Sequence, residues 1–586
     1  MHFLKTNGIF LSSGLAILYG LIHLYSGVLL ELFSTNKLLF DNFDSNLIVW
    51  IFERNYIAIK SFDFINFWNA SSFYPHSNTL AYSDSMISGQ LFYFPLRIIG
   101  LQPLSCLYFT LISIMVIAVI SLDFLLTKYY EYSTIERLLF IIISLFALSM
   151  VNFFGHYQLI AFQLSPSFFV LLMSYLDKPS NKKLILLTIL FIFISSFASY
   201  FAPMAFAISF LVMIFFYKFN LDKYKQLFKS LNEKDKKWIY LSILVIFIFF
   251  IIQIKPYLSI PKLNSFEDYM NVATQYSARP WSLIQASPKS LVYPMFEFKF
   301  VGIHGYWERA YFPGILGILS IILFYIFKFK EISYERYHNE AKLYSIFLIS
   351  LYVLSLGPMI KIPSLLLELL KNSDELKNFK IHLPFYYLAK FLPGLENVRA
   401  PGRFGMMMTV SFAFMTIYVT RILTKKINKK NIIYSLLIIF FIYENQIKVT
   451  EYEYEMKNKE FIKHISVIIK KYEPTLTLPY TKASHLKTIK NYMDILNASN
   501  IHRGRTVAGY GARTTKESNE IAHIDNEYKS SKADISTIVN WSIENNIKYL
   551  IVLDDQYISD LMSLTNKKYK LKYKEKSRAL FEINLK

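Results

Sequence analysis

Long apolar runs recur along the first three quarters of the 586-residue chain, and short charged segments separate them. Because a helix needs roughly 20 predominantly apolar residues to cross a bilayer, we interpret these runs as membrane spans. The pattern predicts eleven of them, near 8–30, 105–127, 138–154, 158–176, 184–200, 203–217, 238–254, 312–327, 343–358, 404–420 and 432–444. The shortest runs fall below a full crossing, so we expect them to be extended at their ends or partly re-entrant; these are 158–176, 203–217 and 432–444.

The loops on the two sides of this predicted bundle differ in charge. Five short loops hold 21 Lys or Arg in 62 residues, namely 128–137, 177–183, 218–237, 328–342 and 421–430. The loops on the other side hold 17 in about three times that length. Cationic loops stay on the cytoplasmic side. We therefore expect the long loops 32–104, 255–311 and 359–403 on the outer face of a cytoplasmic membrane, as parts of a bundle that covers residues 1–444.

The remaining segment, 445–586, has frequent charges and few long apolar runs. In it, the helix-like ISTIVNWSIENN precedes the apolar run Ile547–Leu553. A short apolar run of this kind after a helix is typical of a buried strand. The sequence predicts a small C-terminal α/β domain, and eleven spans would place it outside the cytoplasm.

Composition supports a membrane protein. Hydrophobic residues make up 54% of the chain and charged residues only 18%, where an ordinary soluble domain carries roughly 25%. This balance excludes an ordinary cytosolic enzyme, a disordered chain and a basic nucleic-acid binder, and the net charge of +21 follows largely from the cytoplasmic loops. The single Cys106 excludes an intramolecular disulfide and a cysteine-based metal cluster. Walker A, GxGxxG, HExxH, CxxC and GxSxG motifs are absent.

The first long loop, 32–104, carries the main candidates for catalysis. Asp41 and Asp44 follow the first span, and Asp84 comes forty residues later. Carboxylates at the mouth of a membrane bundle tend to mark a water-filled cavity or a site, and an Asp can act as a general base for an attacking hydroxyl. The alternative is that all three cap helices or turns, because Asp is well suited to both.

The same loop contains an amphipathic stretch. The run Leu47–Ile59 (LIVWIFERNYIAI) predicts an interfacial helix with Glu53 and Arg54 on its wetter face. We count Arg54 among the candidates for substrate binding.

Two further outer segments carry polar candidates for substrate binding. His156, Gln158 and Gln163 lie in FFGHYQLIAFQLSP, where they could bind sugar hydroxyls or phosphate or could equally satisfy helix ends. Trp307 and Glu308 lie in GYWERAYFPG, at the end of the loop 255–311.

A pair of arginines precedes the tenth predicted span. Arg399 and Arg403 lie four residues apart in LPGLENVRAPGRFG. A guanidinium group matches phosphate with two parallel hydrogen bonds, so the pair suits a monophosphate or diphosphate. Snorkelling of both side chains toward lipid headgroups is the alternative.

Ten segments, taken in order, make the chain resemble bacterial multi-spanning proteins of the GT-C glycosyltransferase-like superfamily, which includes protein mannosyltransferases and lipid A aminoarabinose transferases. They are Asp44-Ser45 with Trp50 downstream, FYPHSNTLAYSDSMISGQ, GHYQLIAFQLSP, YSARPWSL, WERAYFPG, SLGP, LPGLENVRAPGRF, LTLPY, AGYG and KYLIVLDD. The match covers most of the chain.

The resemblance implies a GT-C-like bundle whose first outer loop holds an essential Asp facing a cavity for a polyprenyl-phosphate sugar. Carried over by position, Asp44 is that residue, with Asp84 as its partner and Asp41 in reserve. Arg399 and Arg403 would be candidates for binding the donor phosphate. The first loop lacks the adjacent Asp-Glu pair of better-known members, which leaves the identity of the base open.

Together these features predict an inverting membrane glycosyltransferase that moves a sugar from a polyprenyl-phosphate donor to a glycan, lipid or protein acceptor. Membrane lipid is an expected partner and nucleic acid is not. We expect no organic cofactor, the use of a divalent cation stays open, and Glu308 is a candidate acceptor or structural contact. One alternative is a lipid-linked oligosaccharide flippase, which predicts charges at mid-membrane, whereas the predicted spans hold only Asp123 and, at the last position of a span, Glu444. Another is a non-catalytic envelope-assembly protein that retains the fold.

Overall fold

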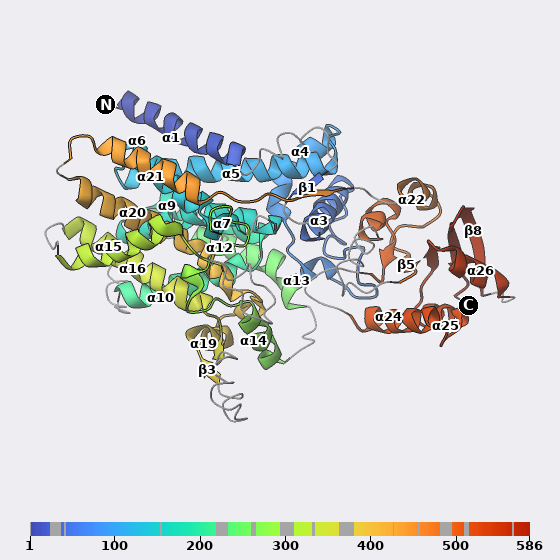
Figure 1. Ribbon diagram of the computed structural model, residues 1–586. Coiled ribbons are helices and arrows are strands. Elements are labelled where there is room, and N and C mark those ends of the chain that lie inside the picture. The colour runs from blue at the N-terminus through green and yellow to red at the C-terminus, as the bar shows by residue number, and fades with distance from the viewer. Residues whose placement is uncertain are drawn as a thin grey trace. The chain divides into compact units, whose positions relative to one another are not determined.

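The computed structural model is mainly helical, with a small sheet region near the C-terminus (Figure 1). It describes residues 2–23, 37–39, 43–152, 155–217, 233–259, 265–293, 310–330, 335–361, 380–425, 427–454, 458–480, 495–508, 515–564 and 568–585. The chain forms two compact units. Unit 1 comprises Met1–Leu30, Leu111–Ile252 and Pro261–Thr450, and unit 2 comprises Glu31–Thr110, Gln253–Ile260 and Glu451–Lys586. This division places the first long loop in the same unit as the C-terminal segment, whereas the sequence pattern predicts that loop as part of the bundle 1–444.

Unit 1 is a helical bundle. Its longer helices are α1 (His2–His23), α6 (Thr134–Phe146), α8 (Ser165–Asp177), α9 (Asn181–Phe197), α10 (Phe201–Tyr217), α12 (Glu233–Phe249), α14 (Phe266–Gln275), α15 (Gly314–Lys330), α16 (Glu335–Ser355), α20 (Thr409–Thr424) and α21 (Lys430–Glu444). The shorter elements are α7 (Leu148–Val151), η3 (Tyr157–Leu164), a π-helical turn at Phe250–Ile254, η5 (Ser282–Ile284), α19 (Pro384–Phe391), η8 (Leu395–Asn397), η9 (Pro401–Met408) and the hairpin of β2 (Met359–Lys361) and β3 (Lys380–His382). The helix α5 (Pro103–Tyr129) begins in unit 2 and continues into unit 1.

Five stretches in the described part of the chain are long and apolar enough to cross a membrane: Pro103–Tyr129, Thr134–Val151, Tyr157–Leu176, Lys236–Leu258 and Pro401–Thr424. Three shorter apolar helices accompany them, at Leu11–His23, Phe201–Val212 and Gly314–Phe327. Helices cover most of each of the eleven predicted spans. The prediction of a mainly helical bundle is thus confirmed, with five stretches in the described residues that could cross a membrane.

The bundle has inner and outer helices. Helix α20 is buried along almost its whole length and packs against α6, α15 and α16. By contrast, only 11% of the span Lys236–Leu258 is buried in the protein, and its exposed residues are mostly Leu, Ile, Val and Phe. An apolar surface of that kind is suited to lipid.

Two adjacent charged residues at the start of α6 connect it to its neighbours. Arg137 donates from Nε to Oδ1 of Asp123 at 2.6 Å, and both side chains are buried. Glu136 accepts hydrogen bonds from Nε and Nη2 of Arg421 at 2.7 and 2.9 Å, and a third from Tyr434. Buried charges are tolerated when they are paired in this way.

Unit 2 contains a mixed five-stranded sheet in the order β6-β5-β7-β9-β8. Its strands are β5 (Pro474–Leu478), β6 (Arg505–Thr506), β7 (Tyr549–Val552), β8 (Tyr569–Glu575) and β9 (Arg578–Ile583). The strands β5, β6 and β7 are parallel, whereas β9 pairs antiparallel with both β7 and β8. The predicted helix and buried strand in this region are confirmed as α25 (Ile535–Glu544) and β7.

Helices cover both faces of this sheet. Successive residues of a strand point to opposite faces, so Leu550 and Val552 join a core with α24 (Lys516–Lys529), α25 and α26 (Asp555–Ser563). Tyr549 and Ile551 join a second core with α22 (Lys459–Ser466). Figure 1 shows α24 and α25 following one another beside the sheet.

The first long loop forms the other part of unit 2. Its elements are β1 (Lys37–Leu39), α3 (Phe43–Lys60), η1 (Thr79–Tyr82), η2 (Ile87–Gly89) and α4 (Gln90–Ile98), together with α13 (Lys255–Leu258) and β4 (Glu451–Glu453). Strands β1 and β4 pair antiparallel. The loop backbone also bonds to the edge of the sheet, because Tyr74 N–H donates to Thr506 O and Thr506 N–H donates to Ser71 O.

Helix α3 is held on several sides. Arg97 of α4 forms a two-pronged ion pair with Glu53, at 2.7 and 2.9 Å. The indole N–H of Trp50 donates to Ser499 Oγ, and Asn500 donates to Trp50 O. The prediction of a helix here is confirmed, but the wetter face is wrong for Arg54, which is only 7% exposed. The loop that follows α3 folds back over this side chain.

Candidate functional site

Asp44 lies in the first turn of α3. A carboxylate at this position is stabilised by the positive end of the helix dipole, by roughly 0.3–1 kcal/mol. The residue is half-buried. This placement gives Asp44 a structural reason to be an acid, in line with the helix-end alternative, and it is also compatible with a chemical role.

Asp84 is buried in the loop between η1 and η2, with 8% of its surface exposed. The next residue anchors this loop. Ser85 O accepts a hydrogen bond from Nδ2 of Asn55 at 2.7 Å, and Ser85 Oγ accepts another from Gln253. A buried carboxylate costs free energy that the groups around it must offset. The loop that carries Asp84 is fixed to the side of α3 by the Asn55–Ser85 hydrogen bond.

The two carboxylates lie along different parts of α3. Eleven residues separate Asp44 from Asn55, and a rise of 1.5 Å per residue puts about 16 Å between their Cα atoms. Asp84 lies in the loop that Asn55 anchors through Ser85. Asp44 is therefore at the start of the helix and Asp84 is beside its C-terminal half.

Arg54 is buried beneath the loop that follows α3. Its Nη2 donates to Asn66 O at 2.7 Å and to Asn69 O at 3.3 Å, and its guanidinium group lies 5.3 Å from the centre of the Phe67 ring. Its Nη1 is buried and has no hydrogen-bond partner in the part of the chain that the structure describes. Burial lowers the pKa of Arg54 to about 10, although the nearby Asp63 raises it, so the group is cationic at neutral pH.

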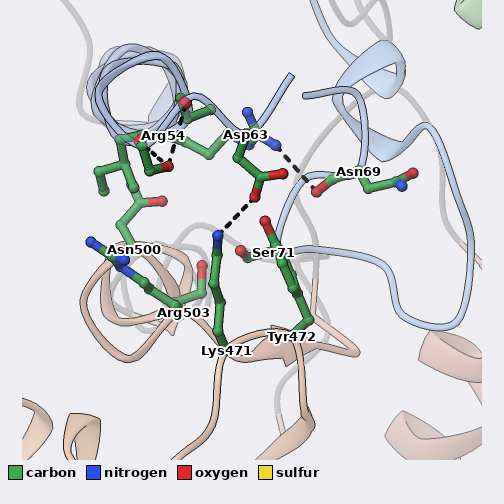
Figure 2. Close-up of a pocket in the computed structure, with 12 residues that line it drawn as sticks. Arg54, Asp63, Asn69, Ser71, Lys471, Tyr472, Asn500 and Arg503 are labelled. Carbon is green, nitrogen blue, oxygen red and sulfur yellow. Dashed lines mark hydrogen bonds and ion pairs between the residues drawn. The ribbon is translucent and has the colours of Figure 1, made fainter. Parts of the chain in front are cut away.

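Arg54 lines a pocket of about 40 Å³ that is partly open to solvent and whose lining residues all belong to unit 2 (Figure 2). One wall is α3 and the loop after it, and the other is the loop before β5 together with the helical segment 495–502. Three cations and one carboxylate line it: Arg54, Lys471, Arg503 and Asp63. Amide, hydroxyl and phenol groups complete the lining, from Asn69, Asn500, Ser61, Ser71, Ser499 and Tyr472.

An ion pair joins the two walls. Figure 2 shows Lys471 reaching Oδ2 of Asp63, where its ammonium group donates at 2.8 Å. Burial raises the pKa of Asp63, but hydrogen bonds from Lys471 and Asn66 and the charge of Lys471 outweigh it and lower the pKa overall. Asp63 is therefore a carboxylate at neutral pH, and the pocket retains two more positive than negative charges.

In the second wall of the pocket, two residues that a backbone hydrogen bond joins have strained backbone conformations. Tyr472 and Arg503 both adopt left-handed conformations, with φ of 68° and 56°. The Tyr472 N–H donates to Arg503 O at 2.9 Å. Non-glycine residues rarely adopt this conformation, and it tends to be held where a site requires it.

Unit 1 contains the polar candidates that follow α7. His156 is half-buried just before η3. Gln163 is fully buried and donates from Nε2 to Leu145 O at 3.4 Å, which is a helix-end contact. The Oε1 atoms of Gln158 and Gln163 are buried without a hydrogen-bond partner in the described part of the chain.

The two arginines of the predicted donor site have different surroundings within unit 1. Arg399 is exposed, and its guanidinium group lies 5.1 Å from the centre of the Tyr276 ring. Arg403 is buried in η9, and its guanidinium group lies 5.1 Å from the Tyr200 ring. Each arginine thus has an aromatic neighbour of its own, and the four-residue spacing does not by itself bring them to one surface.

Three of the predicted site residues, Asp41, Trp307 and Glu308, lie outside the described residues. Within the described ranges, no group of three or more His, Cys, Asp or Glu side chains could hold a metal ion.

Sequence analysis missed three of the four charged groups of the pocket: Asp63, Lys471 and Arg503. They come from segments more than 400 residues apart, and no motif surrounds them. The one local signal is Arg54, which lies next to Glu53 in the amphipathic run Leu47–Ile59.

The chain was also compared with known proteins. No family model matches it, and a search of the curated proteins found no match. The resemblance to GT-C glycosyltransferases therefore stays a prediction from the sequence.

Proposed function

We propose that the chain is an integral membrane glycosyltransferase that transfers a sugar from a polyprenyl-phosphate donor to an envelope acceptor. In this proposal all eleven predicted helices span the cytoplasmic membrane, and unit 2 lies on its outer face. The observation that supports it best is the buried position of Asp84, on a loop anchored to α3 through Ser85 and Asn55. A carboxylate shielded from bulk water is well suited to take a proton from an acceptor hydroxyl.

The chemistry requires a leaving group and a base on opposite faces of the sugar. As the acceptor oxygen forms its bond to the anomeric carbon, the bond to the polyprenyl phosphate breaks, and the electron pair leaves with the phosphate. The acceptor proton passes to the carboxylate. Cationic side chains stabilise the charge that develops on the leaving phosphate, and Arg399 and Arg403 are our candidates for that role.

Asp44 and Asp84 are the two candidate bases, and single substitutions separate them. We would compare envelope glycans by mass spectrometry from cells that express the wild-type chain, Asp44→Asn or Asp84→Asn at matched levels. Loss of a general base lowers a rate by about 10²- to 10⁴-fold. We expect one sugar to disappear from the glycans of the variant that lacks the base.

Asp534→Asn is the matched control. Asp534 is an exposed N-cap of α25, and Asn caps helices about as well as Asp. This variant therefore makes the same chemical change, and we expect it to alter neither the stability of the protein nor the glycans. Unchanged glycans in both Asp44→Asn and Asp84→Asn would contradict the proposal and favour a non-catalytic envelope-assembly protein.

The flippase alternative receives less support from unit 1. It calls for charges at mid-membrane, and Asp123 and Arg137 form a buried ion pair with each other. Ser12 and Ser13 add hydroxyl hydrogen bonds to the same carboxylate. Partners of this kind indicate a structural role for the pair.

A further inference from the structure

The residues that line the pocket of unit 2 carry more positive than negative charge. Arg54, Lys471 and Arg503 oppose the single carboxylate of Asp63, which leaves an excess of two positive charges in this lining. The space inside the pocket is about 40 Å³, which suits a small polar group and is far less than a drug-sized ligand fills. The charge excess indicates an anionic ligand.

Arg54 provides an independent observation. The residue is only 7% exposed, and its Nη1 has no hydrogen-bond partner among the described residues. Leaving a buried charged donor unpaired is costly. Arg54 lines the pocket, so the negative charge of an oxyanion bound there would offset part of this cost, whereas an apolar ligand would leave the cost in place.

The rest of the lining selects among oxyanions. A phosphate monoester carries about two negative charges at neutral pH, which matches the excess of two, and a carboxylate carries only one. Lys471 and Arg503 are exposed and can reach a ligand from solvent. The amides of Asn69 and Asn500 and the hydroxyl of Ser71 offer hydrogen bonds to its remaining polar groups.

We propose that this pocket is a binding site for the phosphate group of a small ligand. The lining of this pocket includes neither the candidate base Asp84 nor Arg399 and Arg403, and the proposal does not depend on glycosyl transfer. Phosphate of this kind occurs both on soluble metabolites and on lipid headgroups, and the experiment distinguishes these sources.

The test measures binding to the purified full-length protein in a non-ionic detergent by isothermal titration calorimetry. The probes are inorganic phosphate, dihexanoyl phosphatidic acid, which carries a phosphate monoester on a short lipid, and dihexanoyl phosphatidylcholine as the zwitterionic control. We expect saturable binding of phosphate, phosphatidic acid or both, and no binding of phosphatidylcholine. Binding of inorganic phosphate indicates a soluble ligand, and binding of phosphatidic acid alone indicates a lipid headgroup.

Charge-removing variants test whether the pocket is responsible. Lys471→Gln and Arg503→Gln change exposed side chains, and each should weaken binding about tenfold, because each removes a charge-assisted hydrogen bond. Lys570→Gln, on the exposed strand β8 and outside the pocket lining, removes the same charge and should leave the affinity unchanged.

Asp63→Asn supplies a gain-of-binding readout. It raises the charge excess of the pocket from two to three, so we expect tighter binding of the same probe by several-fold. A misfolded variant cannot produce tighter binding. Absence of binding to both phosphate probes, or equal affinity in the wild type, Lys471→Gln and Arg503→Gln, would overturn the proposal. Neither result bears on the glycan comparison, so the two proposals fail independently.

Discussion

The ammonium group of Lys471 donates a hydrogen bond to Asp63 across 408 positions of sequence, at 2.8 Å. The pair joins the loop after α3 to the loop before β5, which are the two walls of the pocket in unit 2. Lys471 is 40% exposed and Asp63 is 15% exposed, so water screens the attraction. The pair therefore orders the pocket more than it stabilises the fold.

A double-mutant cycle over Asp63→Asn and Lys471→Gln checks this. We expect a coupling free energy below about 1 kcal/mol, the usual value for a partly exposed ion pair. Thermal unfolding of the full-length protein in detergent measures it. The pKa of Asp63 is lowered in the folded state, so its contribution is complete above its usual pKa and is lost as the pH falls through the folded value. A coupling of several kcal/mol would show that the pair is a main support of unit 2.

His502 should make unit 2 sensitive to acid. It is buried beside the pocket residue Arg503, and its Nδ1 accepts a hydrogen bond from Gly504 N–H at 3.0 Å, which requires the neutral ring. Burial lowers the pKa of His502 from 6.5 to about 4. Between these values the unfolded chain binds the proton and the folded chain does not, so stability falls as the pH drops from 6.5 to 4, by about 3 kcal/mol at most.

Unfolding midpoints of the wild type and His502→Asn between pH 7 and pH 4.5 measure this effect. We expect a flatter pH dependence in the variant, whose side chain does not titrate and whose amide oxygen can still accept from Gly504. His464→Asn is the control, because His464 lies on α22 with 57% of its side chain exposed. Parallel curves for the wild type and His502→Asn would mean that another group is responsible.

How far the sequence predicts this protein depends on the range of the interactions involved. The apolar run Ile547–Leu553 predicts the strand β7, because a short, fully buried strand depends mainly on its own residues and on the helix before it. The apolar runs likewise predict the helices of the bundle. The local pattern around Arg54 predicts a helix but places this residue on a wet face, because its burial depends on the loop at Asn66 and Asn69, which a helical period does not encode.

The pocket depends on contacts between residues that are still farther apart in the sequence. Lys471 and Arg503 lie in the segments just before β5 and β6, so the pairing of these two strands in the C-terminal sheet sets their positions beside α3. A single sequence holds no local signal that predicts a contact between such distant segments. The separation of Asp44 and Asp84 along α3 has the same cause, since the Asn55–Ser85 hydrogen bond determines it.

The buried pair of Asp123 and Arg137 should be essential for the stability of unit 1. Arg137→Met leaves the Asp123 carboxylate buried with only the hydroxyls of Ser12 and Ser13. Loss of one partner of a buried pair costs about 3–5 kcal/mol, so we expect a large drop in the unfolding midpoint in detergent. Arg399→Met, at an exposed arginine, is the matched control and should change it little.

The double variant Asp123→Asn/Arg137→Met completes the cycle. It removes both charges of the pair, so its unfolding midpoint should recover a large part of the drop that Arg137→Met alone causes. A double variant that is as unstable as Arg137→Met alone would show that the packing of the arginine side chain matters more than its charge.

Gly314 at the start of α15 should tolerate no side chain. Glu444 places its carboxylate over this helix end, where it accepts hydrogen bonds from the backbone N–H of Ile315 and the hydroxyl of Tyr293, both at 2.8 Å. Gly314 adopts a φ of +81°, and a Cβ atom there would collide with the Glu444 carboxylate. Gly314→Ala therefore combines backbone strain of about 1–2 kcal/mol with the loss or displacement of a buried cap.

We expect Gly314→Ala to lower the unfolding midpoint in detergent clearly. Gly14→Ala is a matched control, because Gly14 lies inside α1 with no atom within 4 Å of its added Cβ. Ala favours a helix over Gly by up to about 1 kcal/mol, so this variant should be neutral or slightly more stable. If Gly314→Ala also behaves in this way, the carboxylate of Glu444 is free to move aside, and its contact with the first turn of α15 contributes little to the stability of the bundle.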